Sequence, residues 1–214
     1  MLEKFQTAME KTLIPFANKL SQNKVLKAIS GGFSALLPII MVGAIASLLS
    51  GLNIEVYQNF ITSIGLKAIV SYISAYTTNM MAIYAVFSIG NSMAKQLECK
   101  DQSILVGIIS LMVFLLTIPL GVSKDEVTIA AAISTTYFGA PGLFTAMIIG
   151  CVVPLIYNIF VKNHIVIKMP DGVPPQIANG FSAIIPAVCI TAIFAAIRQL
   201  CALTSFATLS GLIY

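Results

Sequence analysis

The sequence predicts an all-α protein: a polytopic transmembrane helix bundle of about five spans, preceded by an amphipathic helix. Of its 214 residues, 58% are hydrophobic and 9% are charged, whereas a soluble domain carries roughly a quarter charged residues. A membrane crossing needs roughly 20 apolar residues. Five stretches of sufficient length lack Asp, Glu, Lys and Arg: 28–54, 68–94, 102–123, 127–161 and 173–197. This composition argues against a soluble monomer, a disordered chain and a nucleic-acid-binding protein.

Residues 1–27 form a segment distinct from the transmembrane part, 28–214. Apolar residues recur there at steps of three and four: Leu2, Phe5, Met9, Leu13, Phe16 and Leu20. This spacing is typical of one face of a helix, and Lys4, Lys11 and Lys19 fall off that face. We expect a cytoplasmic helix that either lies in the inner leaflet interface or packs beneath the bundle.

The positions of the basic residues predict the orientation in the membrane. Nine lysines precede the first span or lie in the second and fourth loops: Lys4, Lys11, Lys19, Lys24, Lys27, Lys95, Lys100, Lys162 and Lys168. Only Lys67, Lys124 and Arg198 are left for the other side. By the positive-inside rule, the N-terminus lies in the cytoplasm of a multi-pass plasma-membrane protein. The first span begins too far along the chain for a signal peptide and is expected to be retained.

The second and fourth stretches are not simple lipid-facing helices. The outer half of the second carries a cluster of polar side chains, namely Ser71, Tyr72, Ser74, Tyr76, Thr77, Thr78 and Asn79. Such residues either hydrogen-bond to neighbouring helices or line a solute path. The fourth stretch is interrupted at residues 139–142, where a helix is expected to begin. From there Gly142, Ala146 and Gly150 allow close helix packing, within the monomer or across a dimer.

The segments 29–38 and 177–186 share six identical residues at one fixed offset. Both begin odd-numbered spans, so a duplication would be parallel; chance similarity between two apolar helices is the alternative. We expect Gly32 and Gly180 to permit close packing, and Pro38 and Pro186 to bend their helices.

Candidate reactive residues are few, and the sequence predicts no catalytic residue, no metal site and no cofactor. The cysteines, Cys99, Cys151, Cys189 and Cys201, form no paired motif and are interpreted as small buried hydrophobes. The single histidine, His164, is expected in a solvated loop, and Asp171 in a Pro-Asp-Gly turn. The other acidic residues of the loops, Glu55, Glu98, Asp101, Asp125 and Glu126, lie outside the predicted spans.

Several motifs together resemble one family of membrane proteins. These are Met-Pro-Asp-Gly-Val-Pro-Pro at 169–175 with Phe-Ser-Ala-Ile-Ile-Pro at 181–186, Leu-Pro-Ile-Ile-Met-Val-Gly at 37–43, and Tyr-Phe-Gly-Ala-Pro-Gly-Leu-Phe at 137–144. The chain resembles, over its whole length, the permease subunit (enzyme IIC) of the lactose/cellobiose class of bacterial sugar phosphotransferase systems. It matches only the N-terminal half, and the family's second half would begin after Tyr214.

The resemblance implies translocation of a β-linked disaccharide such as cellobiose, coupled to phosphorylation by a IIB partner that is loaded through IIA. The phosphoryl donor would be a cysteine of IIB, the dimer contacts would come largely from this half, and the sugar site from the absent half. The substrate-binding residues are therefore unknown. We expect a homodimer without a sugar site of its own, from a shortened or interrupted gene or a partial chain.

Two other functions fit the same residues. A small secondary transporter could build its pathway between two subunits, using the polar second span and the interrupted fourth. Alternatively, a membrane module that does not itself transport could regulate or anchor a full-length permease.

Overall fold

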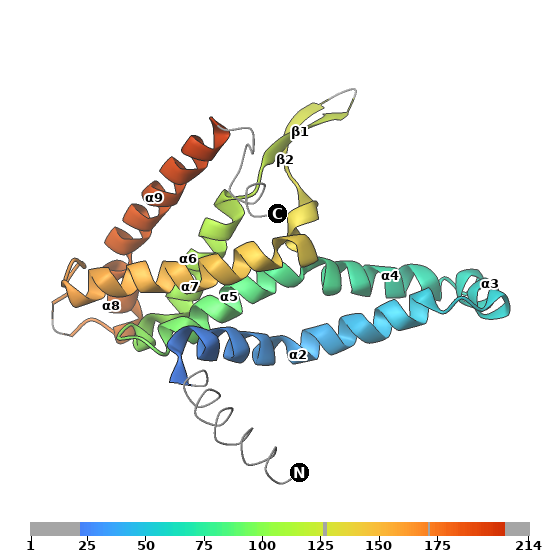
Figure 1. Cartoon of the computed structure of the whole chain (residues 1–214), viewed down its shortest axis with the longest axis horizontal. Helices are drawn as coiled ribbons and strands as arrows, with labels where there is room; N and C mark the ends of the chain where they lie inside the picture. The colour runs from blue at the N-terminus through green and yellow to red at the C-terminus, as the bar shows by residue number, and fades with distance from the viewer. Residues whose placement is uncertain (1–21, 126–127, 171, 204–214) are drawn as a thin grey trace, which may run out of the picture.

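A computed structural model of the chain describes residues 22–125, 128–170 and 172–203. The predicted amphipathic helix lies outside the described residues, as do Glu126 and Asp171. The all-α class is confirmed: apolar helices make up most of the described chain (Figure 1). One element was not expected, a short antiparallel hairpin of β1 (Leu120–Asp125) and β2 (Thr128–Ile133), paired from Leu120–Ile133 to Asp125–Thr128.

The first described helix, α2, spans Lys24–Gly51. It begins where the Asn23 side chain accepts a hydrogen bond from the Val25 amide at 2.9 Å, as expected of a helix N-cap. Its 28 residues extend about 42 Å, more than a bilayer core requires. Its buried residues recur every one or two helical turns and, apart from Leu36, are small. They are Ala28, Gly32, Leu36, Gly43 and Ala46. This stripe faces the bundle, and Pro38 lies within the helix.

The second apolar stretch, 68–94, is interrupted once rather than forming one straight α-helix, and a sharp bend lies just before it. Helices α3 (Glu55–Ser63) and α4 (Leu66–Tyr76) meet at a 93° bend. Gly65 forms this bend with φ +72°, a conformation that favours glycine. After α4 comes a 3₁₀ turn, η1 (Thr78–Met80), and then α5 (Met81–Ala94).

The prediction of about five full crossings is only partly met. Within the described residues, three helical segments are long and apolar enough to cross a membrane, or four if the bent pair is counted as one span. The third predicted span is too short: α6 (Ser103–Leu116) has 14 residues and extends about 21 Å. Pro119 follows closely, and proline disfavours helical continuation. The Arg198 guanidinium donates a hydrogen bond of 2.9 Å to the Leu116 carbonyl, which satisfies one terminal carbonyl of α6.

The interruption of the fourth stretch was correctly predicted. A 3₁₀ turn, η3 (Thr135–Phe138), precedes α7 (Ala140–Lys162). The chain then runs through Gly172, at φ +100°, to α8 (Pro175–Ser182) and α9 (Ile184–Ala202). Pro186 is the third residue of α9, where a missing amide is tolerated, so the expected bend appears instead as the break between α8 and α9.

Helix α5 is the centre of the bundle, with α2, α6 and α7 packed around it (Figure 1). Its buried residues include Ala82, Val86 and Ile89, none of them accessible to solvent. A Cβ at Gly150 of α7 would lie 3.0 Å from the Ile89 Cβ of α5, and one at Gly142 would lie 3.3 Å from Phe114 of α6, so the small-residue stripe of α7 packs within the same chain. Of the two alternatives for that stripe, the intramolecular one is confirmed.

The two copies of the repeated segment occupy different environments. In α2, a Cβ at Gly32 would lie 2.8 Å from Ile89 Cα and 2.9 Å from Ile89 N, so the glycine permits close packing as expected. In α8, nothing lies within 4 Å of the corresponding point at Gly180. The expectation for Gly180 was therefore wrong in this chain: the shared sequence forms a helix twice, but only the first copy packs tightly.

Candidate functional site

An open cavity of about 590 Å³ lies where the second and fourth apolar stretches are interrupted. One wall comes from the end of α4, η1 and the first residue of α5, and the other from η3 and the first turn of α7. Its lining consists of Ala75, Tyr76, Thr78, Asn79, Met80, Met81, Thr135, Thr136, Phe138, Gly139, Ala140 and Pro141. Two irregular segments, about 55 residues apart in sequence, are thus brought together.

Small residues and hydrogen bonds from side-chain hydroxyls to backbone carbonyls hold the break in place. A Cβ at Gly139 would lie 3.2 Å from the Asn79 carbonyl oxygen, so η1 and the start of α7 touch through their backbones. The Tyr84 hydroxyl donates to the Tyr76 carbonyl at 2.8 Å, supplying a partner for a carbonyl at the end of α4. The Thr77 hydroxyl donates to the Ile73 carbonyl at 2.6 Å. Local hydrogen bonds therefore satisfy backbone carbonyls at the interruption, as is required of irregular backbone within a membrane.

The polar residues of the second stretch divide into two groups, one that joins helices and one that lines the cavity. Ser74 of α4 is hydrogen-bonded to Ser47 of α2 at 2.8 Å between hydroxyl oxygens, so part of the cluster joins helices. Tyr76, Thr78 and Asn79 instead line the cavity. Sequence reasoning identified this side of the site but not Thr135 and Thr136, which reach it only through the packing of α7 against α5.

The cavity is uncharged. Its lining side chains offer hydroxyl and amide groups together with apolar surface from Met80, Met81 and Phe138. No carboxylate or imidazole belongs to this lining, so its side chains contain no evident general base. Such a surface is suited to binding a neutral polar molecule, and not to chemistry upon it.

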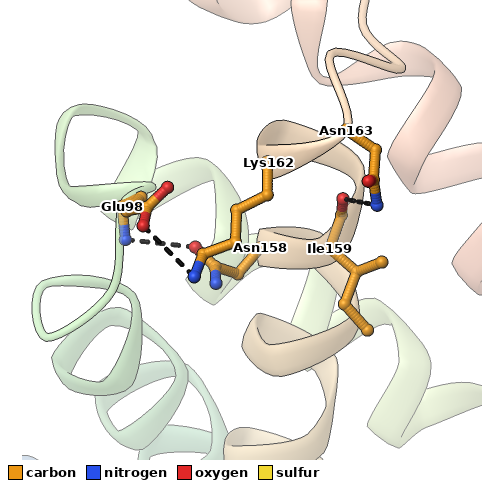
Figure 2. A network of polar contacts seen from close by, with 5 residues as sticks. All are labelled: Glu98, Asn158, Ile159, Lys162 and Asn163. Atoms are coloured by element: carbon orange, nitrogen blue, oxygen red, sulfur yellow. Dashed lines mark hydrogen bonds and ion pairs between the residues drawn. The ribbon is translucent and has the colours of Figure 1, made fainter.

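The ionisable residues singled out in the sequence do not gather at the cavity. His164 is exposed at the turn after α7, with φ +56°, and Glu55 lies in the first turn of α3. Glu98, in the loop after α5, pairs with Lys162 of α7 at 3.2 Å, and its amide donates to Asn158 Oδ1 at 3.1 Å (Figure 2). Both charged side chains are more than half exposed, so the pair contributes little to stability.

The cysteines offer no evident nucleophile. Cys99 and Cys151 are buried as predicted, whereas Cys189 and Cys201 are half-buried. In the loop after α5, burial raises the pKa of the Cys99 thiol to about 11. That thiol is therefore protonated, and poorly nucleophilic, at neutral pH. Among the described residues, no three His, Cys, Asp or Glu side chains are grouped as a metal site.

A second polar constellation lies at the opposite end of α5 and was missed in the sequence. Gln102 precedes α6 and accepts a 2.6 Å hydrogen bond from the Tyr157 hydroxyl of α7. Its Nε2 donates to Ser182 Oγ at 2.7 Å and, more weakly, to Asn179 Oδ1 at 3.4 Å, both on α8. We call these four residues the Gln102 cluster. Tyr157 is fully buried, whereas α8 has no buried residue, so the cluster is a main attachment of α8 to the bundle.

Broken apolar helices that border a cavity are features of membrane transport proteins. The family model described as "Phosphotransferase system, EIIC" matches residues 30–213. The chain belongs to this family of sugar phosphotransferase permease components, which confirms the resemblance seen in its motifs.

Three similar proteins extend this result. The PTS system cellobiose-specific EIIC component of Geobacillus stearothermophilus is 28% identical over 99% of this chain and 49% of its own length. The PTS system lactose-specific EIICB component of Staphylococcus epidermidis is 31% identical over 80% of this chain and 29% of its own length. The crystal structure of the transporter ChbC, the IIC component from the N,N'-diacetylchitobiose-specific phosphotransferase system, superposes with a TM-score of 0.82 at 28% identity, covering 96% of this chain and 49% of ChbC. The chain spans about half the length of the EIIC proteins it matches.

Proposed function

We propose that this chain is the N-terminal half of a IIC permease that carries a β-linked disaccharide, such as cellobiose, across the bacterial plasma membrane. The observation that carries this proposal is the fold match to ChbC over 96% of this chain but only 49% of that transporter. Cellobiose, lactose and N,N'-diacetylchitobiose, for which the three similar proteins are named, are all β-1,4-linked disaccharides. That shared linkage supports a β-linked substrate for this chain as well.

Transport would be coupled to phosphorylation by IIB, which in turn receives its phosphoryl group through IIA. A relative named as an EIICB component supports a IIB partner. Removal of a proton from the attacking sugar hydroxyl calls for a carboxylate or imidazole, and the cavity of this half contains neither. We therefore assign the phosphorylation-competent sugar site to the second half of the permease.

We further propose that the N-terminus is cytoplasmic. The start of α2, which carries Lys24, and the end of α7, which carries Lys162, lie toward one end of the bundle, on the left of Figure 1. Lys95 directly follows α5, which ends there too. The opposite end of α2 leads to α3 and α4, where Lys67 is the sole lysine. An excess of lysines at one end of a bundle is typical of its cytoplasmic side, so we assign the left end in Figure 1 to the cytoplasm.

The proposal predicts that sugar uptake requires both halves. In cells that lack their own IIC but retain IIA and IIB, uptake of radiolabelled cellobiose should stay at background with this chain alone. It should rise well above background when a separately encoded C-terminal half is added. This chain then supplies the helices against which the second half packs, and the second half supplies the sugar site at which phosphorylation occurs. The C-terminal half expressed alone is the matched control.

Two results would contradict this division. Uptake by this chain alone, driven by an ion gradient in vesicles without IIB, would favour a secondary transporter. No uptake by the combined halves, despite their co-purification, would favour a regulatory module that associates with a permease without completing it.

The same proposal includes a homodimer. Light scattering in detergent should therefore give a protein mass of twice that of one chain. The resemblance assigns most dimer contacts to this half, and α2 exposes an apolar stripe at Leu37, Met41, Ile45 and Leu48, each at least 56% exposed. Met41→Trp combined with Leu48→Trp would place bulky side chains on this stripe, so the measured mass should fall to that of a monomer. Val188→Trp on the exposed side of α9 is the control, and a monomeric unmodified chain would refute the dimer.

A further inference from the structure

The open cavity at the helix break lies far along α5 from the end of that helix. It borders η1, about 15 residues before the end of α5, which corresponds to about 22 Å along the helix axis. In the proposed orientation, the end of α5 faces the cytoplasm. With a hydrocarbon core about 30 Å thick, the cavity then lies in the outer half of the membrane, on the side from which a sugar arrives.

The polar groups of the cavity lack partners in the described structure. Thr78, Asn79 and Thr136 are exposed, and their side chains make no hydrogen bond with any described residue. Unpaired hydroxyl and amide groups are costly to place against lipid tails. They are therefore suited to face water or a polar solute rather than hydrocarbon.

The chemistry of the lining matches that of a sugar. Thr78 and Thr136 can donate and accept hydrogen bonds, as can the Asn79 amide, and sugar hydroxyls require both. Tyr76 and Phe138 add aromatic surface, against which the apolar C–H face of a sugar ring can pack. The volume of about 590 Å³ falls within the range of roughly 300–1,000 Å³ found for small-molecule sites. The absence of charged groups from the lining disfavours an ionic solute.

We propose that this cavity is a second saccharide-binding site, which holds an uncharged disaccharide before it reaches the site of phosphorylation. This inference rests on the proposed function and adds to it a sugar contact within the N-terminal half. The site binds without chemistry, because its lining lacks a proton acceptor suited to activate a hydroxyl. Because only part of the sugar would be enclosed by the open cavity, the affinity is expected to be millimolar.

The chain contains no tryptophan, so a single introduced tryptophan can report on the cavity. In nanodiscs, the fluorescence of Tyr76→Trp should change saturably with cellobiose, with half-saturation at millimolar concentrations. Tyr72→Trp, one turn earlier on α4 and outside the lining, is the matched control and should show no saturable change. Adding Asn79→Leu or Thr136→Val to Tyr76→Trp should raise the half-saturation concentration about tenfold or more.

The proposal is overturned if Tyr76→Trp responds only linearly, if Tyr72→Trp responds equally, or if Asn79→Leu and Thr136→Val leave the response unchanged. Saturation-transfer NMR with cellobiose and the unmodified chain gives the same decision should the tryptophan variant fail to fold. This binding measurement needs neither IIB nor the second half. It can therefore fail while uptake by the combined halves succeeds, which would reject the cavity site and leave the proposed function standing.

Discussion

Gly32→Ala should lower the thermal unfolding midpoint of the chain by roughly 2–12 °C, whereas Gly180→Ala should leave it unchanged or slightly raised. The two glycines occupy the same place in the repeated segment, and the substitution is identical. Any difference must therefore come from the surroundings of α2 and α8.

The physical reason is the approach of α2 to α5. A Cβ at position 32 would lie 2.8 and 2.9 Å from backbone atoms of Ile89, and backbone cannot move aside as a flexible side chain can. Overpacking of this kind costs about 1–3 kcal/mol, and each kcal/mol lowers the midpoint by roughly 2–4 °C for a chain of this size. At position 180 there is open space, so alanine adds only its better helix propensity, up to about 1 kcal/mol.

The midpoints can be read from the loss of the monodisperse size-exclusion peak after heating in detergent. Gly51→Ala, at the end of α2 with nothing within 4 Å of the added Cβ, is a control within the same helix. Equal losses at positions 32 and 180 would contradict the structure, because they would require a packed neighbour at Gly180 within this chain.

The repeat also illustrates what the sequence can and cannot predict. Its composition and glycine positions correctly indicate two helices, and residues 139–142 correctly mark the start of α7. Whether a glycine is packed depends on which helix lies opposite, and that is a property of the tertiary structure. The short α6 was missed because its apolar run continues to Ser123, although Pro119 was a visible stop signal. The bend at Gly65 escaped notice because an isolated glycine has several possible roles.

For the candidate site, only part of one wall could be predicted, namely Tyr76, Thr78 and Asn79. Thr78 and Asn79 stand out because polar residues are rare within apolar stretches. Thr135 and Thr136 do not stand out, because they lie in a short segment between the hairpin and α7. Only the contact of Gly139 with Asn79 brings them to the cavity. Gln102 was taken as the boundary of a span, because nothing in its neighbourhood indicates partners 55 and 80 residues away.

Gln102→Ala should be a strongly damaging single change at the end of the bundle opposite the cavity, with a loss of about 2–4 kcal/mol of folding stability. It removes the donor for Ser182 and Asn179 and leaves the hydroxyl of the fully buried Tyr157 without its acceptor. An unsatisfied buried polar group costs about 1–3 kcal/mol, in addition to about 1 kcal/mol for each hydrogen bond lost.

Two further variants separate these contributions. Tyr157→Phe removes the buried hydroxyl and leaves the contacts of Gln102 with α8 intact, so it should cost about 1 kcal/mol. Gln102→Glu keeps an acceptor for Tyr157 but loses the amide donor to Ser182, so its effect should be intermediate.

The double variant provides the decisive comparison. Once Phe occupies position 157, Gln102→Ala no longer strands a hydroxyl, so its additional cost should be smaller than in the unmodified chain. Stability can be followed by thermal unfolding in detergent, and protease sensitivity of the loop at 163–174 can report whether α8 has been released. Strictly additive effects would show that Tyr157 and Gln102 act independently. Non-additive effects together with faster cleavage would mean that one buried hydroxyl, through Gln102, helps hold α8 and the start of α9 against the bundle.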